Sequence, residues 1–152
     1  MSGKLLLGSV AVILGASYGA AAFAQAKPDV LVKQRQAGMT MIGKYWGPIG
    51  GMASGKTPYN AERVARNAPI LEVLSKLPWD GFVESTKDEK SRARAEVWSD
   101  NAKFKAGADR MQKAIAQLAK VSTGDEATVK AALSEVGKTC GGCHDDFREK
   151  NR

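Results

Sequence analysis

The sequence predicts an all-α fold, an antiparallel bundle of four helices, and three observations carry this prediction. Four segments hold apolar residues at alternating steps of three and four, the spacing that places them on one face of a helix. The stretches between these segments hold most of the glycine and proline turn signals. No segment alternates with a period of two residues, so no strand is expected. Amphipathic helices of similar length with short connections favour an antiparallel bundle.

The first predicted helix begins near Asp29, directly after the helix starter Pro28, and ends near Trp46. Gly47 and Pro48 are expected to terminate it. Its inward stripe consists of Val32, Arg35, Met39, Ile42 and Trp46. One charged residue therefore lies among apolar ones.

The second predicted helix starts after Asn60, a favourable N-cap residue, and runs to Leu77. Pro69 lies inside its pattern, and because proline removes a backbone donor we expect a kink or a break there. The third helix is predicted to begin near Ser91 or Arg92. The last helix presents an inward stripe of Val129, Leu133, Val136, Cys140, Cys143 and Phe147, so both cysteines are expected to face the core.

The first residues are typical of an export signal, which we assign to residues 1–24. Lys4 precedes an apolar stretch from Leu5 to Ala22, and Ala22 and Ala24 supply the small residues of a cleavage site. A retained membrane anchor is the alternative. Residues 25–152 then form a single domain, because their length suits one core and not two.

The chain is basic, with 23 Lys and Arg against 16 Asp and Glu and a formal net charge of +7, to which Lys4 contributes one. The basic residues are spread over every segment and mixed with acidic ones, which indicates solvated helix faces and no nucleic-acid surface. The positive sign favours an acidic redox partner or an anionic membrane surface.

The last helix carries Cys140, Gly141, Gly142, Cys143 and His144, the Cys-x-x-Cys-His sequence that attaches haem covalently. Two sulfurs three positions apart lie on one face of a helix and match two vinyl groups, and the next histidine reaches the iron. A thioredoxin-like pair would need a preceding strand, a zinc site would need further ligands, and a structural disulfide is a third alternative.

His144 is the only histidine, so no second histidine is available and the sixth iron position is left to methionine, an exogenous ligand or nothing. Met39 lies in the inward stripe and is the methionine to consider. A lone buried guanidinium is costly, so Arg35, one turn before Met39, needs an anion such as a haem propionate, unless it extends to solvent. Met111 is expected to be core filler.

At this point the chain resembles the cytochrome c prime family of class II c-type cytochromes. The resemblance rests on the haem motif with Asp145, Asp146, Phe147 and Arg148 after it, and on residues 35–39, 77–79 and 96–98. It spans essentially the whole of residues 25–152. It implies one haem c on the C-terminal helix of an up-down-up-down bundle, the topology for which this family is a standard example.

The resemblance also implies site residues and partners. It implies that Arg35 and Gln36 lie on the propionate side, and that Met39 covers the distal face without bonding the iron. Two alternatives for Met39 are a low-spin His/Met haem and a core residue without a role. Arg148, one turn after His144, either flanks the proximal pocket or is a solvated helix end. A homodimer is expected, with Tyr45 and Ile49 as apolar outer positions of the first helix.

Two functional classes follow from these assignments. The first is a periplasmic five-coordinate haem protein that binds nitric oxide or carbon monoxide. The second is an electron carrier in which Met39 ligates the iron. A peroxidase generally uses a distal histidine to move protons, and this chain has none, so we expect no enzyme activity.

Overall fold

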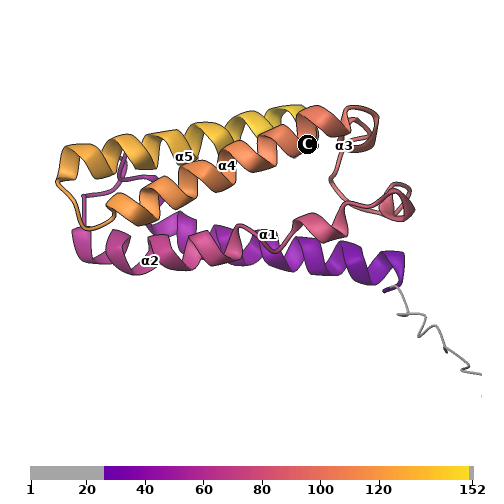
Figure 1. Cartoon of the computed structure of the whole chain (residues 1–152), viewed down its shortest axis with the longest axis horizontal. Helices are drawn as coiled ribbons and strands as arrows, with labels where there is room; N and C mark the ends of the chain where they lie inside the picture. The colour runs from indigo at the N-terminus through magenta and orange to yellow at the C-terminus, as the bar shows by residue number, and fades with distance from the viewer. Residues whose placement is uncertain (1–25, 151–152) are drawn as a thin grey trace, which may run out of the picture.

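The computed structural model describes residues 26–150, and the expected signal at residues 1–24 lies outside that range (Figure 1). Four long helices form the bundle: α1 (Pro28–Gly50), α2 (Ala61–Leu74), α4 (Asn101–Val121) and α5 (Glu126–Phe147). The connection between α2 and α4 holds two short 3-10 helices, η1 (Trp79–Gly81) and η2 (Glu84–Thr86), and the single-turn helix α3 (Glu96–Ser99). No strand forms within residues 26–150, which agrees with the predicted all-α class.

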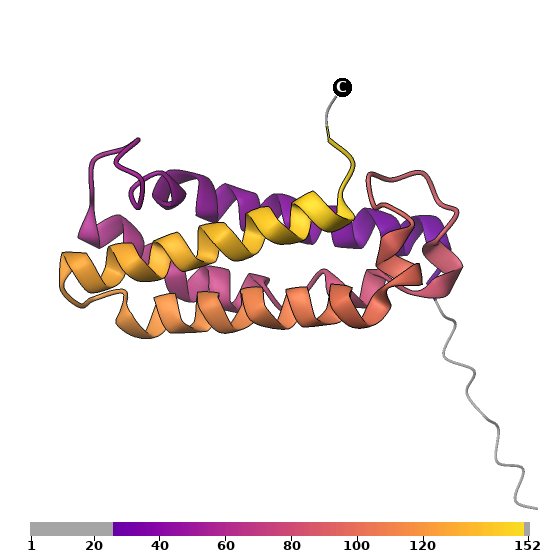
Figure 2. The ribbon, with the colours of Figure 1, turned by 90° about the horizontal axis from the view of Figure 1, so that it is seen from above.

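The long helices run up, down, up and down (Figures 1 and 2). The pairs α1 with α2, α2 with α4, and α4 with α5 make most of the contacts, whereas α1 and α5 touch over a smaller region. The expected antiparallel four-helix bundle is confirmed. None of the helices in the described part of the chain is long and apolar enough to cross a membrane.

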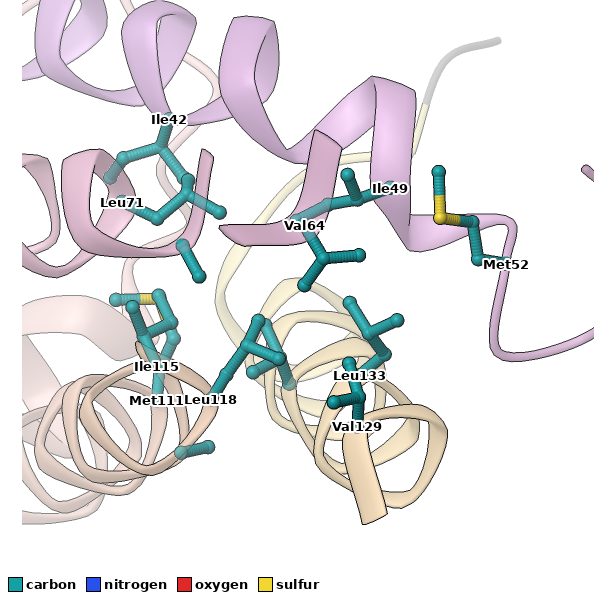
Figure 3. Close-up of a cluster of buried hydrophobic side chains, with 13 residues drawn as sticks. Ile42, Ile49, Met52, Val64, Leu71, Met111, Ile115, Leu118, Val129 and Leu133 are labelled. Carbon is teal, nitrogen blue, oxygen red and sulfur yellow. The ribbon is translucent and has the colours of Figure 1, made fainter. Parts of the chain in front are cut away.

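Side chains from all four long helices meet in the main core cluster (Figure 3). Its buried members are Ile42, Ile49, Met52, Val64, Ala68, Leu71, Met111, Ala114, Ile115, Leu118, Val129, Leu133 and Val136. Burying a side chain of the size of leucine stabilises the fold by about 1.5–3 kcal/mol. Met111 is buried in this cluster, as predicted for a core filler.

The first helix is longer than predicted, because α1 continues through Gly47 and Pro48 to Gly50. Gly47 and Pro48 are exposed, whereas Ile49 is fully buried. The burial of Ile49 holds the last turn against the core and outweighs the local breaking tendency of the two residues before it. The expectation that Ile49 and Tyr45 lie on the outer face is wrong, since Tyr45 is partly buried against the same core.

The second helix begins as predicted, with the Asn60 side chain accepting a hydrogen bond from the backbone N–H of Arg63 at 2.7 Å. Pro69 lies within one continuous helix, so the predicted break is wrong. Pro69 is itself exposed, but Ala68 and Leu71 are fully buried on either side of it. Packing of these neighbours keeps the helix in place through the proline.

The third helix starts later than predicted. Residues 91–94 are not helical; the backbone N–H of Arg94 donates to the carbonyl of Phe147 at 3.0 Å instead. The long third helix of the bundle, α4, begins at Asn101, where the Asp100 side chain accepts a hydrogen bond from the backbone N–H of Lys103. A long-range contact with the end of α5 therefore decides the conformation of the segment before α3.

Candidate haem site

The two cysteines lie one turn apart on the last third of α5, and both are partly buried with free thiols. Cys140 packs against the main core cluster, and Cys143 packs against a second cluster formed by Val97, Phe104 and Phe147. Burial, with a smaller contribution from Cys143, raises the pKa of the Cys140 thiol to about 11. Burial also raises the pKa of Cys143. Reactive redox cysteines have lowered pKa values, so this environment disfavours a thioredoxin-like pair.

The backbone around the cysteines leaves room on one side of α5. A Cβ atom placed on Gly141 or Gly142 would meet nothing within 4 Å. On the other side, a Cβ placed on Gly107 of α4 would lie 3.6 Å from the Sγ atom of Cys143. The helix is therefore packed closely to α4 at Cys143 and open at its two glycines.

His144 follows Cys143 directly and is exposed near the end of α5. Partial desolvation lowers the pKa of its imidazole, and the positive charges of Arg148 and Arg92 lower it further, against a smaller opposing effect of Asp145. The lowered pKa favours the neutral imidazole, the form that coordinates a metal ion. Within residues 26–150, no group of three or more His, Cys, Asp or Glu residues is arranged to hold a metal ion, which gives the zinc alternative no support.

Aromatic rings line the region beside Cys143. Trp79 and Phe82, from η1 and the residue after it, pack against Phe104 of α4 with ring centroids 5.9 Å and 4.8 Å away. Phe104 in turn lies 5.3 Å from the Phe147 ring. A pocket of about 170 Å³ opens between Trp79, Phe82 and α4. The connection between α2 and α4 thus supplies an aromatic wall beside Cys143.

Arg35 is buried, with 3% of its surface exposed, so the alternative that it extends to solvent is wrong. Its Nη1 donates to the carbonyl of Gly81 at 2.7 Å and to the hydroxyl of Thr86 at 2.8 Å. Its Nη2 donates to the hydroxyl of Ser91 at 3.0 Å, and the guanidinium lies 4.5 Å from the Phe82 ring centroid. These bonds occupy three of the five N–H groups of the guanidinium, so Nε and one hydrogen of Nη2 remain for an anion.

The other residues from the first helix differ in burial. Met39 is partly buried and packs against the main core cluster, as Cys140 does. Gln36, beside Arg35, is exposed. Met41 is also exposed, with 39% of its surface accessible, in line with its place on the far side of α1.

Arg148 is the C-cap residue of α5, and its backbone N–H donates to the carbonyl of His144 at 3.1 Å. Its side chain is exposed. The sequence reasoning did not anticipate the contacts of Thr86 and Ser91 with Arg35, or the clustering of Phe82 with Phe104. The only indication of these contacts in the sequence was the presence of two aromatic residues, at positions 79 and 82, in a charged loop.

The donor set fits a covalently bound haem, because two free thiols on one helix face, an adjacent neutral imidazole and an apolar aromatic wall are all present. The family model described as Cytochrome C' matches residues 30–148 of this chain. The chain belongs to the cytochrome c prime family. Cytochrome c prime proteins carry one covalently attached haem c, and this chain is accordingly a mono-haem c-type cytochrome.

Individual cytochromes c prime match over nearly their whole length. That of Rubrivivax gelatinosus is 43% identical over 126 residues, which cover 82% of this chain and 98% of the relative. That of Alcaligenes xylosoxydans xylosoxydans is 38% identical with the same coverage.

Solved structures agree with these sequence matches. The crystal structure of the Rubrivivax gelatinosus protein has a TM-score of 0.74 at 42% identity and covers 81% of this chain and 98% of that one. Cytochrome c prime from Shewanella frigidimarina has a TM-score of 0.77 at 31% identity, with coverages of 83% and 99%. A leucine-to-alanine mutant of the Alcaligenes xylosoxidans protein, solved as its nitric oxide complex, has a TM-score of 0.73 at 37% identity and coverages of 84% and 99%.

Proposed function

We propose that this cytochrome binds diatomic gases, nitric oxide and carbon monoxide, at a five-coordinate haem held by Cys140, Cys143 and His144. The observation that carries the proposal is the single histidine of the chain, because it leaves no second imidazole for the sixth position. The nitric oxide complex of the mutant Alcaligenes protein supports the same chemistry. When bound, the haem would supply the iron that takes the gas.

Each residue then has a separate task. Cys140 and Cys143 would hold the haem through thioether bonds, and the neutral imidazole of His144 would bind its iron. The free N–H groups of Arg35 bind a propionate, with exposed Gln36 beside it. The aromatic wall of Trp79 and Phe82 places apolar surface beside Cys143, which favours an apolar gas over a polar ligand.

Met39 covers the distal face in this proposal without bonding the iron. This assignment is supported by the packing of Met39 against the main core cluster, against which Cys140 also packs. Replacing Met39 by alanine removes steric cover only, so we expect faster binding of carbon monoxide and an unchanged high-spin ferrous spectrum. Stopped-flow mixing and optical spectroscopy measure both, with Met41→Ala on the exposed side of α1 as the control.

A low-spin spectrum of the unmodified protein that Met39→Ala converts to high spin would contradict this assignment. Thioether sulfur is a competent haem ligand, and two fixed ligands suit electron transfer. The electron-carrier function, with an acidic redox partner, would then take its place.

We further propose that the protein is exported to the bacterial periplasm after removal of residues 1–24 and that it has no enzyme activity.

We also propose that the protein acts as a homodimer. Val73 and Leu77, at and after the end of α2, are 64% and 58% exposed and are better interface candidates than Tyr45 and Ile49. Sedimentation at micromolar concentration tests the dimer, and Leu77→Asp should yield monomers while a Met41→Asp control does not.

A further inference from the structure

Residues 91–94, which we call the strap, lie against the end of α5 and are not helical. The backbone N–H of Arg94 donates to the carbonyl of Phe147 at 3.0 Å, and the N–H of Glu149 donates to the carbonyl of Arg92 at 2.9 Å. These two bonds form an isolated antiparallel bridge between Ala93 and Arg148. The guanidinium of Arg92 adds a third hydrogen bond, to the carbonyl of Glu149. The strap therefore fixes the chain that follows the haem motif.

The bridge also determines on which side Arg148 lies. The two hydrogen bonds flank Ala93 and Arg148, so these residues form a non-hydrogen-bonded pair, in which side chains lie close together on the same face of the ladder. Ala93 packs against the second core cluster, as Cys143 does. The side chain of Arg148 therefore leaves the backbone on the side of the strap that carries the methyl group of Ala93.

A single hydroxyl group joins the strap to the first helix. The Oγ of Ser91 accepts hydrogen bonds from Nη2 of Arg35 at 3.0 Å and from the backbone N–H of Ala93 at 3.2 Å. Arg35 is held in turn by Gly81 and Thr86. Both acceptor sites of the hydroxyl are thus used, one by α1 and one within the strap.

Within residues 26–150, the Arg148 guanidinium makes no ion pair or side-chain hydrogen bond. It borders an open cleft of about 530 Å³, which Arg94 and Asp145 also line. The backbone position that the strap imposes is therefore the main restraint on this charge.

We propose that Ser91 is a positioning residue that, by tying the strap to Arg35, holds the positive charge of Arg148 beside His144. The inference rests on the proposed haem site. A fixed cation beside the iron ligand disfavours the more positive ferric state, so it raises the reduction potential of the haem. Through Ser91, the first helix thus influences the charge environment of His144.

Amide hydrogen exchange of the haem-loaded full chain tests the structural half of the proposal. Ser91→Ala removes two hydrogen bonds, each worth about 1 kcal/mol, so we expect the N–H groups of Arg94 and Glu149 to exchange about tenfold faster or more. Ser91→Thr, which keeps the hydroxyl, should restore the slow exchange. Ser99→Ala, at an exposed position of α3, is the matched control and should have no effect. Unchanged exchange in Ser91→Ala would overturn the proposal.

The reduction potential tests the electrostatic half. We expect Ser91→Ala to lower the potential in the same direction as Arg148→Gln and by a smaller amount. In the Arg148→Gln background, Ser91→Ala should have no further effect, because the charge it positions is gone. If Ser91→Ala shifts the reduction potential equally in the unmodified protein and in Arg148→Gln, the role of Arg148 is overturned. If Met39 proves to ligate the iron, the proposed five-coordinate haem fails, but the exchange rates and the comparison of backgrounds still decide the role of Ser91.

Discussion

The buried positive charge of Arg35 is stabilised by neutral oxygen atoms and by an aromatic ring. Its acceptors belong to Gly81, Thr86 and Ser91, and its guanidinium lies over Phe82. Hydrogen bonds that involve a charged group are stronger than those between neutral groups, and a cation over a ring adds to them. Arg35 therefore fastens the connection between α2 and α4 to the first helix.

Replacing Arg35 by alanine should lower the free energy of unfolding by about 3 kcal/mol, because several charge-assisted hydrogen bonds are lost in a buried site. Urea denaturation of the haem-loaded protein measures the change. Gln34→Ala, at an exposed position of the same helix, is the control and should change stability by less than about 0.5 kcal/mol. If Arg35→Ala lowers the free energy of unfolding no more than Gln34→Ala does, Arg35 does not hold the connection between α2 and α4 to the first helix.

At the residue scale, the sequence was most informative where a function needs adjacent residues. Cys140, Cys143 and His144 form a local pattern whose spacing has one chemical use. The position of Arg35 in an apolar stripe predicted that its buried guanidinium needs an anion or hydrogen-bond acceptors. Which partners it has depends on how residues 81–91 fold over the first helix, and that long-range arrangement has no local signature.

Among the elements, α5 depends on a charged cap at its start. The carboxylate of Asp125 accepts hydrogen bonds from the backbone N–H and the hydroxyl of Thr128 at 2.9 Å and 2.7 Å. These bonds lower the pKa of Asp125 below its usual value near 3.9. A carboxyl group whose pKa is lower in the folded state stabilises the fold above its unfolded pKa and loses this effect as the pH falls through the folded pKa.

We therefore expect the stability of the unmodified protein to fall more steeply below about pH 4 than that of Asp125→Asn, whose amide oxygen can cap the helix but does not titrate. Thermal unfolding followed by circular dichroism between pH 3 and 6 measures the difference. Parallel curves for the two proteins would show that the cap charge does not contribute.

Element boundaries were predicted well where a cap decides them and poorly where tertiary contacts do. Asn60 begins α2 as predicted. Pro48 and Pro69 do not end their helices, because neighbouring residues such as Ile49 and Leu71 are fully buried and hold the chain helical. The strap is not helical because it pairs with residues 147–149, more than fifty positions away in the sequence.

At the scale of the whole molecule, the bundle brings distant segments to one end. The connection between α2 and α4, the start of α4 and the end of α5 lie together there (Figures 1 and 2). The aromatic cluster, the strap and the haem motif thereby surround one site. Periodicity predicted the four helices and their antiparallel order, since both follow from apolar spacing and short connections.

The most direct test of the account is denaturing electrophoresis of the full chain with haem staining. We predict that the stain stays with the unfolded protein and survives acid acetone, because both sulfurs are bonded to the ring. Cys140→Ala and Cys143→Ala should each weaken the stain and the double variant should abolish it, whereas Met39→Ala should retain it. Complete extraction of haem from the unmodified chain by acid acetone would contradict covalent attachment through Cys140 and Cys143.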